Sequence, residues 1–89
     1  MSKLQDSTSK GVYTIYDSKA KFYSTPFYSP NDDTAIREFV RIVNDTASNI
    51  NPFPDDYSLF KIGTFSDTTG LISPQDINLL TLGNDVKVS

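Results

Sequence analysis

Two short β-type runs separated by a turn lie near the start of the chain, and they constrain the fold more than any other feature. Residues 11–16 (Gly-Val-Tyr-Thr-Ile-Tyr) are mostly β-branched and aromatic, which favours an extended strand. Residues 17–20 are turn formers, and residues 21–25 return to aromatic and hydroxyl side chains. Pro26 has no N–H to donate, so it ends the pairing or marks a sheet edge. The pattern predicts an antiparallel hairpin.

The hairpin is also the most aromatic part of the sequence. Six of the eleven aromatic side chains lie between Tyr13 and Tyr28. Alternation along the first strand places Tyr13 and Ile15 on one face and Tyr16 on the other. The aromatics interleave with three lysines: Lys10, Lys19 and Lys21.

Residues 29–44 are predicted to form a helix. Ser29 is a suitable N-cap, Pro30 suits the first helical position, and Asp32 would complete a capping box. Asp32 and Asp33 also complement the positive end of the helix dipole. The apolar residues recur with helical spacing and form one stripe: Ala35, Ile36, Phe39, Val40 and Val43.

The second half of the chain predicts a loop and a second strand pair. Residues 45–56 include two prolines and read as a loop. Residues 57–66 form a strand with a bulge at Gly63, and residues 67–70 form a hairpin turn. Residues 73–82 have two interpretations. Ser73-Pro74-Gln75-Asp76 resembles a helix cap, whereas residues 78–82 also suit a strand.

The summed order is β-β-α-β-β, a small two-layer α+β domain with one helix packed on an antiparallel sheet. We expect the domain to span residues 11–82, with a flexible N-terminal tail at 1–10 and a C-terminal tail at 83–89. One helix covers only one face of a sheet. The opposite face carries aromatics, and a second copy of the chain is the simplest cover, so we expect a homodimer.

Composition excludes several classes of chemistry. The chain has no cysteine and no histidine, which removes disulfides, thiolate nucleophiles, zinc ribbons and the commonest general base. The acidic pairs Asp32-Asp33 and Asp55-Asp56 suit a helix N-terminus and a loop better than a metal or catalytic site. We therefore expect a non-enzymatic protein without catalytic residues, metal or cofactor. No apolar run approaches the roughly 18 residues of a membrane span, and the N-terminus lacks the apolar segment of a signal peptide.

Charge is unevenly distributed along the chain. Residues 1–30 carry a net charge of +2, and residues 31–89 carry −5. An acidic whole is a poor non-specific ligand for nucleic acid, but a local basic face could still bind phosphate. Charged residues of this kind most often lie on a solvated surface without binding a ligand.

The aromatic and cationic cluster is the strongest candidate site. Rings beside lysines on a sheet are typical of proteins that bind single strands, because bases stack on the rings while lysines follow the phosphates. The same rings also suit a hydrophobic core or a dimer interface. The candidate nucleic-acid-binding residues are Tyr13, Tyr16, Lys19, Lys21, Tyr23, Tyr28, Arg37 and Arg41.

An ordered series of short motifs resembles a known family. The series is Tyr16-Asp17-Ser18-Lys19-Ala20, Pro26-Phe27, Ser29-Pro30, Thr34-Ala35-Ile36-Arg37, Val43-Asn44-Asp45, Asp55-Asp56-Tyr57-Ser58-Leu59-Phe60 and Ile62-Gly63. It is similar to the small nonstructural protein of gokushovirus-type microviruses, phages with single-stranded DNA genomes. The resemblance runs from about Val12 to Thr81.

The resemblance implies a non-enzymatic role in the synthesis and packaging of the single-stranded genome, in the host bacterial cytoplasm. Two functions are compatible with it. The protein binds single-stranded DNA through the aromatic hairpin, or it is an adaptor that contacts the replication initiator or procapsid without touching DNA.

Overall fold

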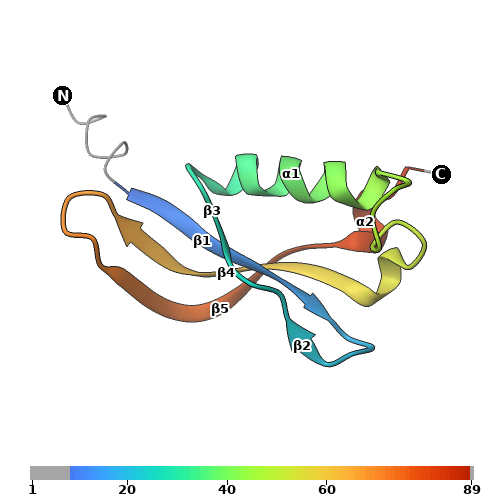
Figure 1. The fold of residues 1–89 in the computed structure, drawn as a ribbon, viewed down its shortest axis with the longest axis horizontal. Helices are drawn as coiled ribbons and strands as arrows, with labels where there is room; N and C mark the ends of the chain where they lie inside the picture. The colour runs from blue at the N-terminus through green and yellow to red at the C-terminus, as the bar shows by residue number, and fades with distance from the viewer. Residues whose placement is uncertain (1–8, 89) are drawn as a thin grey trace.

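A computed structural model describes residues 9–88 of the chain. One antiparallel sheet carries one main helix on a single face (Figure 1), which confirms the predicted α+β class. The elements in chain order are β1 (Ser9–Asp17), β2 (Phe22–Tyr23), β3 (Phe27–Ser29), α1 (Asp32–Asn44), the 3-10 helix η2 (Pro54–Asp56), β4 (Tyr57–Ser66), β5 (Ile72–Leu82) and α2 (Gly83–Val86).

The predicted hairpin forms one side of the sheet. The strand order is β2-β1-β4-β5, and β3 pairs with β1 on the same side as β2. The two short strands are therefore pieces of one edge, interrupted before Pro26. Ser24 bridges the interruption, because its N–H donates to the Ile15 carbonyl at 2.8 Å and its Oγ accepts from the Ile15 N–H at 3.1 Å.

A bulge in β4 confirms the irregularity expected at Gly63. Val12 pairs with Gly63 while Tyr13 pairs with Lys61, so Ile62 is the extra residue. A bulge of this kind increases local twist and places two successive side chains on the same side of the sheet.

Helix α1 begins later than predicted. Its N-cap is Asn31, whose side-chain oxygen accepts from the Thr34 N–H at 2.8 Å. Ser29 is instead the last residue of β3, where it pairs with Gly11 and is buried. Pairing with β1 keeps Ser29 extended, so the cap moves to the next residue with a suitable side chain.

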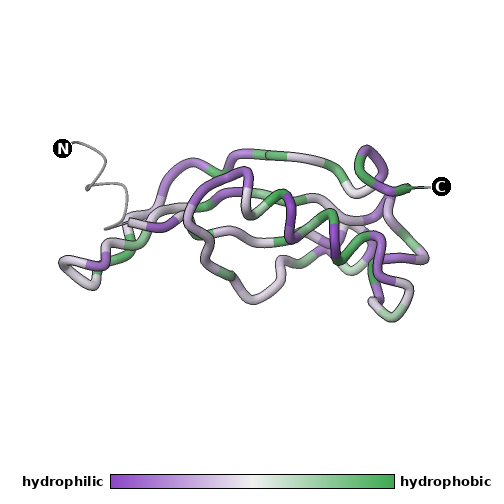
Figure 2. The backbone as a smooth tube through the Cα atoms, turned by 90° about the horizontal axis from the view of Figure 1, so that it is seen from above, coloured by the Kyte–Doolittle hydropathy of each residue, from purple (hydrophilic) through white to green (hydrophobic). Residues whose placement is uncertain are grey.

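The core lies between α1 and the sheet. Hydrophobic and hydrophilic residues alternate around the turns of α1 (Figure 2), as the predicted stripe requires. Five side chains in this layer are fully buried: Tyr13, Ala35, Phe39, Val43 and Leu59.

The ambiguous segment 73–82 is a strand. It forms most of β5, which pairs only with β4 within residues 9–88. Pro74 lies opposite Gly63 in this edge strand, a position where a missing N–H is tolerated.

The described residues extend beyond both predicted domain boundaries, 11 and 82. Strand β1 begins at Ser9, and the rest of the predicted N-terminal tail, residues 1–8, lies outside the described residues. At the other end, α2 follows β5 directly where a tail was expected. Asn44 fixes this end, because its Nδ2 donates to the Val86 carbonyl at 3.0 Å and its Oδ1 accepts from the Val88 N–H at 2.7 Å.

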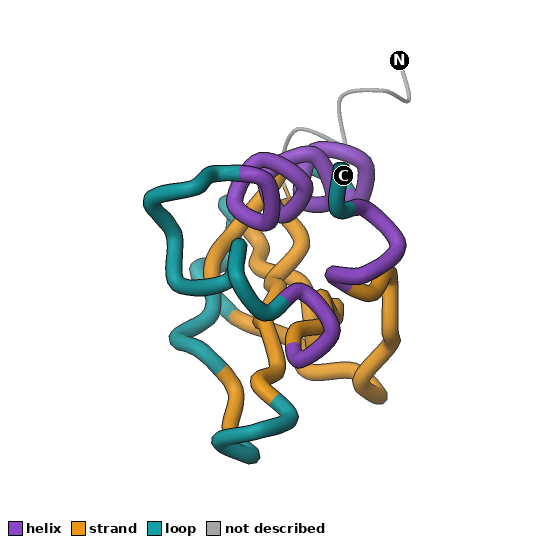
Figure 3. Tube along the Cα trace, turned by 90° about the vertical axis from the view of Figure 1, so that its right-hand side faces the viewer, coloured by secondary structure: helices purple, strands orange, loops and turns teal. Residues whose placement is uncertain are grey.

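The molecule is two layers thick. Viewed from its end, α1 lies on one side of the sheet and no helix of the described chain covers the opposite side (Figure 3). Figure 1 looks down the shortest axis and shows α1 above the sheet, so the two layers stack along the intermediate axis, whose extent is 25 Å. Within residues 9–88, one face of the sheet therefore has no helix over it.

Candidate nucleic-acid interface

The uncovered side of the sheet, called here the open face, is largely aromatic and aliphatic. Register assigns its members, because residues paired across antiparallel strands share a face. Thr14 pairs with Phe60, which pairs in turn with Leu79. The open face comprises Val12, Thr14, Tyr16, Tyr23, Tyr28, Phe60, Ile62, Phe65, Ile77, Leu79 and Leu82.

Three rings form a cluster on the open face. The ring centres of Tyr16 and Tyr23 are 4.6 Å apart with planes tilted by 43°. Tyr23 also meets Phe60 edge-on at 6.1 Å. Tyr23 is 50% exposed, so its ring remains available to a ligand. The strands β1, β2 and β4 thus bring together rings that are far apart in sequence.

A second aromatic pair lies at the other end of the open face. Tyr28 of β3 meets Phe65 of β4 edge-on, with ring centres 5.7 Å apart. Tyr28 is 50% exposed. Because Val12 pairs with both Tyr28 and Gly63, the pair lies across the part of β1 that is most deeply buried.

A shallow groove of about 390 Å³ adjoins the ring of Tyr23. Its walls are the six side chains of Thr14, Tyr23, Ser24, Pro26, Ile62 and Ile77. Two of its three hydroxyls are already used, because Thr14 Oγ1 donates to the Ser24 carbonyl at 2.8 Å and Ser24 Oγ accepts from the Ile15 N–H. The groove therefore offers apolar contact more than hydrogen bonding.

Two exposed lysines flank the aromatic cluster in the turn between β1 and β2. Asp17 shapes this turn, since its Oδ1 accepts from the N–H groups of Lys19 at 3.0 Å and Ala20 at 3.1 Å. Lys21 adopts a positive φ of 62°. It directly precedes Phe22 and Tyr23, the two residues of β2. The turn therefore presents two cations; Asp17 is engaged with the backbone, and Lys19 also borders a hollow lined by Asp55 and Asp56.

Lys10 is not free in the same way. Its ammonium lies 2.9 Å from Asp67 Oδ2 at the opposite end of β1. Both side chains are exposed, so this ion pair contributes little to stability, but it neutralises the charge that Lys10 would offer.

Tyr13 was wrongly predicted to be part of the nucleic-acid-binding site. Its side chain is fully buried on the α1 side of the sheet, 5.8 Å from the ring of Phe27. Its hydroxyl donates to Asp32 Oδ1 at 2.7 Å. Burial, with the added effect of Asp32, raises the pKa of this hydroxyl above its ordinary value. The ring belongs to the core and cannot stack with a ligand.

Arg37 and Arg41 also lie away from the candidate surface. Both are exposed on α1, the layer opposite the open face. Arg41 forms an ion pair with Glu38, which lowers the pKa of that carboxyl through the hydrogen bond. A strand bound across the open face would not reach them, so we remove both from the site.

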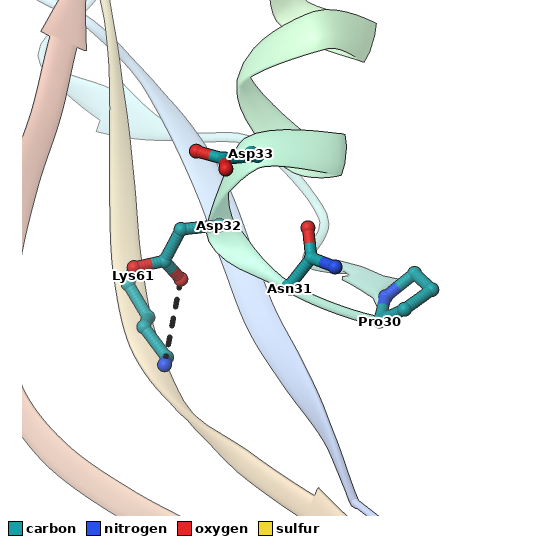
Figure 4. A pocket seen from close by; sticks show the side chains of 5 residues that line it. All are labelled: Pro30, Asn31, Asp32, Asp33 and Lys61. Carbon is teal, nitrogen blue, oxygen red and sulfur yellow. Dashed lines mark ion pairs between the residues drawn. The ribbon is translucent and has the colours of Figure 1, made fainter. Parts of the chain in front are cut away.

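Asp32, the first acidic residue of α1, is engaged in structural contacts. The Asp32 carboxylate points across the gap to β4, where its Oδ1 lies 3.5 Å from the Lys61 ammonium (Figure 4). Asp33 lines the same hollow. Within residues 9–88, no group of three or more potential metal-ligating acidic side chains is assembled.

Several open-face residues were absent from the predicted site. Phe60 and Ile62 come from β4, and Ile77 and Leu79 come from β5. The alternation of residues 57–62 already placed Phe60 and Ile62 on one face. Sheet order was the missing information, since only the β1–β4 pairing sets them beside the hairpin.

The structure and site define a small α+β protein with one aromatic sheet face left uncovered. No helix of its described part has the length and apolar character needed to span a bilayer.

The chain belongs to the phage ORF5 protein family, whose model matches residues 10–86. The match confirms a phage protein; it does not specify gokushovirus-type microviruses. Neither curated proteins nor solved structures provide a match.

Proposed function

We propose that this phage accessory protein binds single-stranded DNA across its open face and assists synthesis or packaging of a single-stranded genome in the host cytoplasm. The observation that carries the proposal is the cluster of Tyr16, Tyr23 and Phe60 beside the exposed lysines of the β1–β2 turn. The resemblance to gokushovirus nonstructural proteins supports the same role.

The aromatic cluster supplies the stacking surface that the proposal requires. Each base stacked on an aromatic ring contributes about 1–3 kcal/mol to binding, with little dependence on sequence. The half-exposed ring of Tyr23 packs against the rings of Tyr16 and Phe60. A ring held in this way loses little conformational entropy when a base stacks on it.

The turn supplies the electrostatic contribution. Lys19 and Lys21 are exposed at the end of the hairpin that carries the cluster, where they would contact phosphates on either side of a stacked base. Two phosphate contacts give a modest salt dependence, with a slope of about −1.4 in log K against log salt for a single strand. The acidic remainder of the chain disfavours binding elsewhere.

The groove beside Tyr23 suits a second, unstacked base. Its walls are mostly aliphatic and aromatic, and the hydroxyls of Thr14 and Ser24 already have protein partners. It would therefore accept a base by apolar contact without selecting its identity, so we propose a sequence-tolerant binder.

Charge reversal in the turn tests this proposal. Lys19→Glu with Lys21→Glu should abolish binding of a fluorescent oligonucleotide of about 20 nucleotides, measured by anisotropy at low salt. The matched control is Arg37→Glu with Arg41→Glu, which changes the net charge equally on the other layer. Equal loss in both variants, or none in the first, would rule out the turn as the phosphate contact.

An adaptor without DNA affinity is the second candidate function. The observation that favours it is the aliphatic part of the open face on β5, together with the net charge of −5 over residues 31–89. This half would meet a basic surface of the replication initiator or procapsid. The two functions separate in one titration, since an adaptor shows no affinity for single-stranded DNA at physiological salt.

A further inference from the structure

Strand β5 leaves a long sheet edge without a partner. It spans Ile72–Leu82 and pairs only with β4 in the described chain. All residues from 72 to 79 are exposed. An edge of this length presents a row of unpaired N–H and C=O groups, which natural proteins usually shorten, charge or cover. Asp76 is the only charged side chain in the strand, and the other protective features are Pro74 and the two register shifts in its pairing with β4.

We propose that β5 pairs with β5 of a second copy, antiparallel across a two-fold axis at Asn78. In this register Asn78 lies opposite the partner's Asn78, and Ile77 lies opposite the partner's Leu79. Ile77 and Leu79 share the open face, since Leu79 pairs with Phe60 and Ile77 lines the groove on that face. The two copies therefore contribute four aliphatic side chains in direct cross-strand contact.

Charge is compatible with this register. Asp76 would face Leu80 of the partner subunit, so the two carboxylates are not set opposite each other. Like charges directly opposite would destabilise the pair. Pro74 lies towards the end of the paired segment, where edge strands tolerate proline.

The area involved fits a weak dimer. Ile77, Leu79 and Leu82 are 47%, 48% and 41% exposed in the single chain. Pairing of two β5 segments would bury roughly 1,000 Å² in total, the low end of specific interfaces, and we expect a dissociation constant in the micromolar range.

Such a dimer would extend the open face. Isologous pairing continues one sheet through both copies, with the two open faces on the same side. The groove that includes Ile77 would lie close to the axis in each copy. This assembly does not depend on DNA binding. The dimer and the DNA-binding function can therefore be tested independently of each other.

Cysteine crosslinking tests the register directly, because the chain has no native cysteine. Directly opposed residues in an antiparallel pair have Cα atoms about 4.5–5.5 Å apart, within the range of a disulfide. Asn78→Cys should therefore form a covalent dimer under mild oxidation. Gln75→Cys is the matched control on the same exposed strand. Its two copies would lie roughly 20 Å apart and should stay uncrosslinked.

Sedimentation equilibrium gives an independent measurement. The wild-type chain should pass from monomer to dimer between about 1 and 300 μM. Leu79→Lys should shift this transition to at least tenfold higher concentration, whereas Leu71→Lys, outside the paired segment, should leave it unchanged. Circular dichroism confirms that each variant is folded. A wild-type chain that remains monomeric throughout, or equal crosslinking at positions 75 and 78, would overturn the proposal.

Discussion

The hydroxyl of Tyr13 donates a 2.7 Å hydrogen bond to the carboxylate of Asp32, which joins the central strand β1 to the first turn of α1. Asp32 also lies 3.5 Å from the Lys61 ammonium on β4. One carboxylate thus links the helix to two neighbouring strands. Together with the buried core, these two contacts hold the first turn of α1 against one face of the sheet.

Tyr13→Phe should destabilise the fold by about 1 kcal/mol. The variant keeps the ring but removes the donor, and a hydrogen bond to a partly exposed charged acceptor contributes in this range. Urea unfolding measures the change. Tyr16→Phe is the control, because its hydroxyl has no hydrogen-bond partner within residues 9–88. Equal effects from the two substitutions would contradict the role given to the Tyr13–Asp32 contact.

Stability should fall at high pH, in part through Tyr13. Burial first, and then Asp32, raises its pKa above the ordinary value of 10. A raised pKa means that the folded state retains the proton that the unfolded state loses. The contribution is therefore complete below pH 10 and is lost as pH rises through the folded-state pKa, with a slope of up to about 1.4 kcal/mol per pH unit.

The difference between wild type and Tyr13→Phe isolates this effect. Tyr57 also has a raised pKa, mainly through burial and secondly through Asp17, so the variant should keep a shallower alkaline slope. Urea unfolding from pH 8 to 11 gives both curves. Parallel curves would show that Tyr13 does not titrate differently in the folded state.

Gly11→Ala should cost about 1–3 kcal/mol through overpacking. A Cβ at Gly11 would overlap the hydroxyl end of the Tyr13 ring, which is fully buried and cannot move aside. Thermal unfolding measures the loss. In a Tyr13→Leu background the same substitution should cost much less, since the overlapping atoms are gone. If Gly11→Ala lowered stability equally in the wild-type and Tyr13→Leu backgrounds, the strain would not arise from overlap with the Tyr13 ring.

Asn44→Ala should release the C-terminal end without unfolding the sheet. The side chain holds the Val86 carbonyl and the Val88 N–H, and no other side chain in the described chain bonds to either group. Amide hydrogen exchange should rise at Val88 and in α2 while protection in β1 and β4 stays unchanged. Unchanged exchange at Val88 would show that apolar packing alone holds this end.

Tyr23→Leu should weaken binding of single-stranded DNA by roughly 10–100-fold, the loss of about one stacked base. The ring is half exposed, so stability should change little. Val88→Ala is the matched control, because Val88 is 72% exposed and lies after α2, where its N–H donates to Asn44 of α1, away from the open face. Anisotropy with the same oligonucleotide compares the two. Equal affinities would mean that the Tyr23 ring is not a stacking surface.

Local pattern was sufficient to predict the fold class, the main helix and the strands β1 and β4, but not β3, η2 or α2. The hairpin, the helix stripe and the bulge at Gly63 all follow from side-chain periodicity and turn chemistry. The helix start was wrong because Ser29 and Asn31 are both good caps, and only pairing of Ser29 with Gly11 decides between them. Segment 73–82 was ambiguous because a Ser-Pro cap motif and a strand can share one sequence.

The site was harder to predict because it depends on which face each strand turns outward. Alternation separated Tyr13 from Tyr16 but could not say which of them faces the helix. In the structure, Tyr13 packs against α1 and belongs to the core. The contributions of Phe60 and Ile77 depend on the order of β1, β4 and β5 in the sheet, a long-range property that composition and spacing do not encode.

A nuclear magnetic resonance titration tests directly whether the open face binds single-stranded DNA. Isotope-labelled protein is titrated with a single strand of about 12 thymidines, and amide shifts are mapped onto the two layers. We expect shifts in residues 14–24 and 58–62 and at Ile77, with α1 unaffected. Shifts confined to α1 around Arg37 and Arg41, or none at any strand concentration, would contradict it.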